Sequence, residues 1–147
     1  MTKRWLSLLI ITLYLVGRST AFDANSDLDL STFIPSQQSG HMFIGSPNDY
    51  LGYSLSVVGD VNQDGFNDFI ASAPQASPSG RTLAGTSFMI FGTAHGVGTV
   101  DINTWASSPA AGFKIIGALP NDMIGTSVSG AGDYNNDGCA DILVLRQ

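Results

Sequence analysis

Beyond residue 21, apolar residues recur along the chain with the spacing of β-strands. Small polar and apolar residues alternate over 53–57 (YSLSV) and 126–130 (TSVSG), which is the period-two pattern of a strand with one buried face. Glycines and prolines separate these stretches from short apolar runs. The pattern predicts an all-β chain with one full set of four strands, at 52–58, 68–73, 86–92 and 112–117. It also predicts a last strand at 41–45 and a first pair at 125–130 and 141–146.

The chain contains a repeat of about 72 residues. The segment DLSTF, which begins at Asp29, returns as DINTW from Asp101. A longer segment that begins at Pro47 returns from Pro120, so that spacing and residue types both recur. The repeat divides the region 22–147 into a first unit of about 29–100 and a shorter second unit of about 101–147.

A four-stranded meander that recurs at a fixed period is typical of a β-propeller blade. The sequence therefore predicts a partial β-propeller built from four-stranded antiparallel blades, with one complete blade and parts of two others. A β-solenoid and a small β-sandwich are the structural alternatives. Because a propeller needs several more blades, we expect the sequence to be an N-terminal fragment, a truncated gene product or a degenerate remnant.

Two equivalent loops, GDVNQDGFND and GDYNNDGCAD, concentrate oxygen atoms between predicted strands. Alternate residues of such a tight loop can turn their oxygens inward, and a glycine at the sixth position permits the sharp turn. Calcium binds six to eight oxygens at about 2.3–2.6 Å, and clustered carboxylates repel one another unless a cation lies among them. The sequence predicts two Ca²⁺ sites whose ligands come from Asp60, Asn62, Asp64, Phe66 and Asp68, and from Asp133, Asn135, Asp137, Cys139 and Asp141. Phe66 and Cys139 would contribute their backbone carbonyls.

Other interpretations of these loops fit the sequence less well. A polar turn without a metal explains one such loop better than it explains two in the same register. An EF-hand would end in a glutamate at position 12, where this chain has Ala71 and Val144. Magnesium demands stricter octahedral geometry with retained waters, so calcium is the expected ion.

The N-terminus has the layout of a secretory signal peptide. Lys3 and Arg4 precede an apolar run of about 12 residues, whereas roughly 20 are needed to span a bilayer. We expect residues 1–21 to be removed and no other membrane-spanning segment to exist. The remaining chain has three basic residues against 12 acidic ones, all aspartate, which argues against nucleic-acid binding.

These motifs resemble the FG-GAP repeats of integrin alpha-chain propellers and their secreted relatives. The family's Phe-Gly pair has counterparts in Leu51-Gly52 and Ile124-Gly125. Its Gly-Ala-Pro has a counterpart in Ser72-Ala73-Pro74 and is missing from the second copy. The oxygen-rich loop between them matches position by position. The resemblance implies that the loops hold calcium and that the propeller presents a ligand surface.

The sequence therefore predicts a secreted or cell-surface calcium-binding module that mediates extracellular binding or adhesion to a protein or glycan. The alternative is the non-catalytic propeller of a secreted hydrolase, either phospholipase-D-like or polysaccharide-active. We expect no enzymatic activity, since no nucleophile motif, histidine constellation or further carboxylate pair is present. Meander geometry places both calcium loops on one face, and the loop 74–85 and the interblade links on the other. A partner is expected on that second face, with Arg81 and Tyr50 as candidates.

Overall fold

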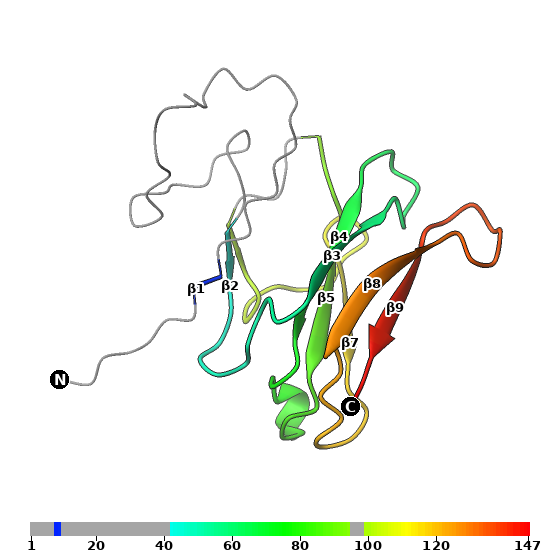
Figure 1. The fold of residues 1–147 in the computed structure, drawn as a ribbon. Helices are drawn as coiled ribbons and strands as arrows, with labels where there is room; N and C mark the ends of the chain where they lie inside the picture. Colours follow the sequence, from blue (N-terminus) through cyan, green and yellow to red (C-terminus); the bar gives the residue numbers. More distant parts are fainter. Residues whose placement is uncertain (1–7, 10–41, 95–98) are drawn as a thin grey trace, which may run out of the picture.

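The structure is a computed structural model that describes residues 8–9, 42–94 and 99–147 (Figure 1). The predicted unit 29–100 begins outside these residues. Most of the predicted leader, 1–21, also lies outside them. The strands are β1 (Leu8–Leu9), β2 (Met42–Ile44), β3 (Leu55–Gly59), β4 (Asp68–Ala73), β5 (Thr86–Ile90), β6 (Thr99–Asp101), β7 (Gly112–Ile116), β8 (Ser127–Gly132) and β9 (Asp141–Leu145). The short 3-10 helix η1 (Pro78–Gly80) is the single helical element of the described residues, and no helix there could cross a bilayer.

Four strands form one complete antiparallel blade in the order β3-β4-β5-β7. These are the four strands that the sequence predicts, with ends that agree to within a few residues. The next two predicted strands, β8 and β9, pair with each other as the beginning of another blade. The chain is therefore all-β, and it has the complete blade and the partial neighbour expected of a propeller.

The N-terminal side of the blade differs in detail from the prediction. β2, expected as a lone last strand, pairs with β6 in parallel and with β1 in antiparallel orientation. The sequence did not predict β6 or η1, because each spans three residues, too few to show a periodic pattern. β1 lies inside residues 1–21, the segment that the sequence predicts to be a leader.

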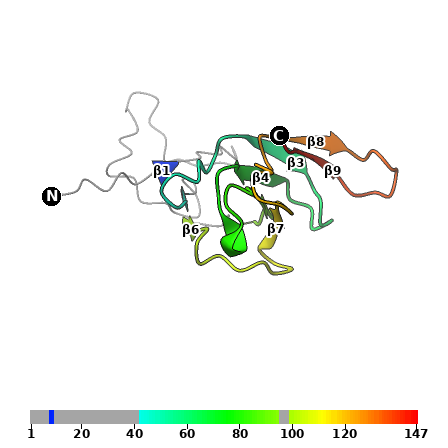
Figure 2. The same cartoon turned by 90° about the horizontal axis from the view of Figure 1, so that it is seen from below.

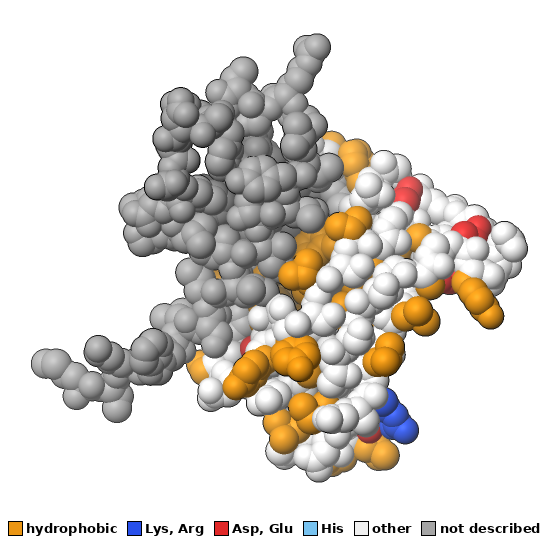
Figure 3. All heavy atoms as spheres, in the orientation of Figure 1, with side chains coloured by type: hydrophobic (Ala, Val, Ile, Leu, Met, Phe, Trp, Pro, Cys, Tyr) orange, Lys and Arg blue, Asp and Glu red, His pale blue; other side chains and the backbone are white. Residues whose placement is uncertain are grey.

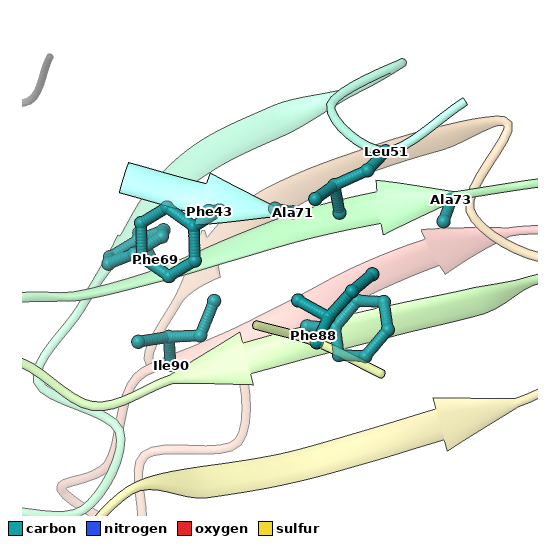
Figure 4. Close-up of a cluster of buried hydrophobic side chains, with 8 residues drawn as sticks. Phe43, Leu51, Phe69, Ala71, Ala73, Phe88 and Ile90 are labelled. Carbon is teal, nitrogen blue, oxygen red and sulfur yellow. The ribbon is translucent and has the colours of Figure 1, made fainter. Parts of the chain in front are cut away.

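Both faces of β4, inside the complete blade, are buried, and consecutive residues of this strand point to opposite sides. Phe69 faces β2, where its ring meets Phe43 edge-to-face with 5.3 Å between centroids. Ile70 faces the other side and packs with Met89 and with Val128 of β8. Figure 4 shows the apolar cluster that contains Phe43 and Phe69, in which side chains from β2, β4 and β5 meet. Two independent apolar layers thus join the blade to its neighbours on either side.

The second blade approaches the first through small residues. Figure 2 shows β8 running beside β3, and the Val128 amide of β8 donates to Oγ of Ser54, the residue before β3, at 3.1 Å. A Cβ on Gly125 would lie 2.6 Å from both Ser72 Cβ and Ser87 Oγ, and Gly125 has a φ of +90°. Glycine is required there by both space and conformation. This gives a physical reason for the glycine of the Ile124-Gly125 pair.

Candidate metal-binding loops

The two oxygen-rich loops lie side by side at one end of the sheets. The first joins β3 to β4, and the second joins β8 to β9, both at the upper right of Figure 1. Acidic side chains gather at this end in Figure 3. The loop 74–85 lies at the other end, where the Thr82 and Leu83 carbonyls accept the amides of Asn121 and Met123 in the interblade link. The predicted division into two faces is therefore confirmed.

In the first loop, alternate side chains turn inward toward the backbone. The two carboxylate oxygens of Asp60 accept the amide hydrogens of Asp64 (3.0 Å) and Gly65 (2.8 Å). Asn62 Oδ1 also accepts the Asp64 amide at 3.1 Å. Asp64 Oδ1 in turn accepts the Phe66 amide at 2.9 Å. The loop winds around its own side-chain oxygens, as the alternating pattern of the sequence predicts.

The second loop repeats these hydrogen bonds residue for residue. The Asp133 carboxylate accepts the amides of Asp137 (3.0 Å) and Gly138 (2.9 Å), and Asn135 Oδ1 accepts the Asp137 amide at 2.9 Å. Asp137 Oδ1 accepts the Cys139 amide at 2.8 Å. That bond, followed by one from the Asn135 side chain, lowers the pKa of the Asp137 carboxyl. Two sequences that differ at four of ten positions therefore adopt one geometry.

The last aspartate of each loop closes it against the sheet. Asp68 is fully buried, and its oxygens accept the amides of Val61 and Gly92, each at 2.8 Å. Burial raises the pKa of the Asp68 carboxyl, the two amides oppose this, and the charges of Asp64 and Asp60 raise it further. The negative charges of Asp60 and Asp64 therefore act on the carboxyl of Asp68. In the second loop, Asp141 accepts the Tyr134 amide at 2.8 Å in the same way.

Backbone geometry is also shared between the loops. The strand before each loop has a register shift, between Val57 and Gly59 in β3 and between Gly130 and Gly132 in β8. Both Gly59 and Gly132 have positive φ values, of 88° and 67°. Such a bulge twists a strand and redirects the residue that follows. Here it directs Asp60 and Asp133 into their loops.

Direct contacts connect the two loops to each other. The Ala140 amide donates to the Asp60 carbonyl at 3.3 Å, and Gln63 Nε2 donates to Cys139 Sγ at 3.2 Å. Burial, together with the nearby charge of Asp137, raises the pKa of the Cys139 thiol. Both effects favour the neutral thiol over the thiolate.

The donor set of each loop fits a hard cation. Every side-chain donor is an oxygen, which suits Ca²⁺ or Mg²⁺ better than a transition metal. In the described part of the chain, the one ion pair joins Arg146 to Asp122, so no lysine or arginine neutralises either loop. Within the same residues, no three Asp, Glu, His or Cys side chains converge closely enough to hold a metal by themselves. Asparagine and carbonyl oxygens would therefore have to complete each site.

The structure brings together most of what the sequence singled out and adds contacts that it could not reveal. All side-chain candidates lie in the two loops, and their role as metal ligands stays a prediction, as does the carbonyl role of Phe66 and Cys139. The Gly92 amide, which donates to Asp68, lies 24 residues away in sequence. Glycine has no side chain, so the sequence does not indicate this contact. The contact between Gln63 and Cys139 spans 76 residues and depends on how two blades pack.

Comparison with known protein families gives one match in this region. The FG-GAP repeat model matches residues 51–88, which include β3, the first loop, β4 and most of β5. The match therefore contains the whole of the first oxygen-rich loop.

Two kinds of curated protein are similar over a longer stretch. Mouse integrin alpha-E is 34% identical over 119 residues, which is 79% of this chain and 9% of that protein. Mouse integrin alpha-7 is 30% identical over 137 residues, covering 88% of this chain and 10% of its own length. Bovine phosphatidylinositol-glycan-specific phospholipase D is 30% identical over 102 residues, or 69% of this chain and 12% of that enzyme. The chain thus spans about a tenth of the length of these relatives.

Proposed function

Since the chain belongs to the FG-GAP repeat family, we propose that it is a calcium-binding β-propeller module that mediates binding or adhesion outside the cell. The observation that carries this proposal is the duplicated loop. Two loops with different sequences make the same set of hydrogen bonds around inward-turned oxygens. A turn that only connects strands needs no such precise repetition.

Each loop would bind one ion through the oxygens already turned inward. The first site would use Asp60, Asn62, Asp64, Asp68 and the Phe66 carbonyl. The second would use Asp133, Asn135, Asp137, Asp141 and the Cys139 carbonyl. Calcium would supply the positive charge that the loops lack, and no residue of the chain would undergo chemistry there. Its role is structural, because each loop joins two strands and an ordered loop fixes the end of the hairpin.

An extracellular location follows from the leader and from the proposed ion. Extracellular calcium modules typically have a Kd of about 10⁻⁴–10⁻³ M. The calcium outside the cell can saturate such sites. Export would remove residues 1–21 and with them β1, so that Phe22 becomes the first residue of the mature chain. N-terminal sequencing of the exported protein checks this boundary, and an intact Met1 in exported material would contradict it.

The similarity to a phospholipase D supports a second candidate function. In that case, the module would be the non-catalytic propeller of a secreted hydrolase. The calcium loops would have the same structural role in both proteins. Hydrolytic activity of a longer natural form containing this chain would distinguish the two, and its absence would favour the adhesion module.

Calcium is expected to raise the thermal stability of the chain. At a free calcium concentration ten times the Kd, each site stabilises the folded state by about 1.4 kcal/mol, because the unfolded chain does not assemble the ligands. For a domain of this size, two occupied sites shift the melting temperature by roughly 5–15 °C. Differential scanning calorimetry in millimolar calcium and in chelator measures this shift.

The matched control for this measurement is a chain with Asp60→Asn and Asp133→Asn. These substitutions keep an oxygen acceptor in each loop and remove one charge from each. The calcium-dependent shift should largely disappear in this variant. Equal melting temperatures of the unmodified chain with and without calcium would refute the proposal.

A further inference from the structure

An open cavity of about 710 Å³ lies at the end of the blade away from the oxygen-rich loops. Its walls come from four segments that are far apart in sequence. These are the turn after β2, the loop that carries η1, the facing ends of β5 and β7, and the link that follows β6. The cavity therefore exists only where the complete blade meets the β2–β6 side. It lies on the face where the sequence predicts a partner, although neither Arg81 nor Tyr50 lines it.

One positive charge faces this cavity without a carboxylate partner. Among the described residues that line it, Lys114 is the only lysine or arginine. Its Nζ lies over two aromatic rings, 5.7 Å from the centroid of Phe88 and 5.8 Å from that of Trp105. No ion pair between Lys114 and an acidic side chain forms within the described residues. Stacking on two rings restricts the side chain and so lowers the entropy cost of a further contact.

The one carboxylate that the described residues place in the cavity wall forms no ion pair with Lys114. Asp49 is 6% exposed, and its two oxygens accept the amides of Ser46 (2.7 Å) and Leu51 (3.0 Å). Its negative charge is thus held by the backbone of its own turn. Among the described residues of the wall, the Lys114 ammonium is therefore the charge left to pair with an anionic group.

The remaining wall suits a peptide better than a sugar. Asn48 and Gln75 bring two amide side chains, each able to donate to and accept from a peptide backbone. Ile116 adds exposed apolar surface, with 39% of its area accessible. Sugars stack on open ring faces, but Phe88 is 4% exposed and the partly buried ring of Trp105 is covered by the lysine ammonium.

We propose that this cavity binds an acidic side chain of a partner protein, with Lys114 pairing to its carboxylate and Asn48 and Gln75 hydrogen-bonding to the adjacent backbone. The inference deepens the proposed binding function and rests on it. The surface lies away from the calcium loops, so the ions stabilise the module while a separate site contacts the partner.

The test is a titration of the ¹⁵N-labelled full chain with blocked tripeptides, followed by NMR. Acetyl-Gly-Asp-Gly-amide should shift the resonances of Asn48, Gln75 and Lys114, and acetyl-Gly-Asn-Gly-amide should bind at least tenfold more weakly. Binding of the acidic peptide should also weaken at high ionic strength. Glucuronate forms the sugar arm, and tighter binding of glucuronate than of the acidic peptide would overturn the peptide assignment.

Variants separate the lysine from general charge effects. Lys114→Met keeps the apolar stem over the rings and should weaken acidic-peptide binding about tenfold or more. Arg146→Gln removes one charge at an exposed position outside the cavity and should change binding less than twofold. Equal binding by the Lys114→Met variant, or equal binding of both peptides, would refute the site.

The calorimetric experiment distinguishes this inference from the proposed function. If calcium stabilises the chain but the acidic peptide does not bind, the cavity assignment fails alone. If the peptide binds at Lys114 and calcium has no effect on stability, the calcium module fails and the cavity remains.

Discussion

Replacing Asp64 by asparagine is expected to weaken calcium binding at the first loop on the order of tenfold or more. The side chain keeps its shape, and its oxygen can still accept the Phe66 amide that Asp64 accepts at 2.9 Å. The substitution removes one negative charge and the Oδ2 acceptor that Asn62 Nδ2 donates to at 2.8 Å. Ligand charge count is a main determinant of calcium affinity. Isothermal titration calorimetry of the purified chain measures the affinity of each site.

Asp101→Asn provides the matched control for this substitution. Asp101 lies outside both loops. Its carboxylate accepts hydrogen bonds from the backbone and side-chain nitrogens of Asn103, each at 2.9 Å. Its loss removes the same charge from the chain without touching a proposed ligand. Equal losses of affinity in the two variants would show that general charge, and not coordination, explains the effect.

Phe69→Ala and Ile70→Ala are each expected to destabilise the chain strongly, although the two residues are neighbours on one strand. Large-to-small substitutions in a well-packed core cost about 2–5 kcal/mol. In a sheet with one solvent-exposed face, only one of two consecutive residues would carry such a cost. Here Phe69 is 5% exposed and Ile70 is fully buried, because a different neighbour covers each face of β4.

Urea denaturation of both variants measures this pair of effects. Val57→Ala is the control, since Val57 lies on the adjacent strand β3 with 49% of its area exposed. Its substitution should change stability by about 0.5 kcal/mol or less. A large loss at Phe69 with a negligible loss at Ile70 would indicate a sheet that packs on one side only, which would contradict a propeller blade.

The strands of the complete blade could be predicted because their burial leaves a mark on the sequence. β4 is buried at all six positions and reads as a short apolar run, while β3 alternates exposed and covered residues. The loops could be predicted because oxygen-bearing residues recur in them at fixed spacing, and two copies show the spacing twice. Both kinds of signal are local, so that a single pass along the chain reveals them.

The features that could not be predicted depend on contacts between distant segments. β6 has three residues and exists because β2 offers a parallel edge. The cavity around Lys114 needs side chains from 46–49, 75–79 and 102–103 in one place. Lys114 itself reads as an ordinary polar position in a strand. Nothing within β7 indicates that two aromatic rings lie beneath the ammonium group.

The hydrogen bond from the Ala140 amide to the Asp60 carbonyl has a consequence for how the two loops respond to ions. Asp60 belongs to the first proposed site, and Ala140 lies between two proposed ligands of the second. If each loop holds an ion, ordering of one loop restrains the backbone of the other, and less entropy remains to be lost there. The two sites would then be thermodynamically linked, and by reciprocity each would favour occupancy of the other to the same degree.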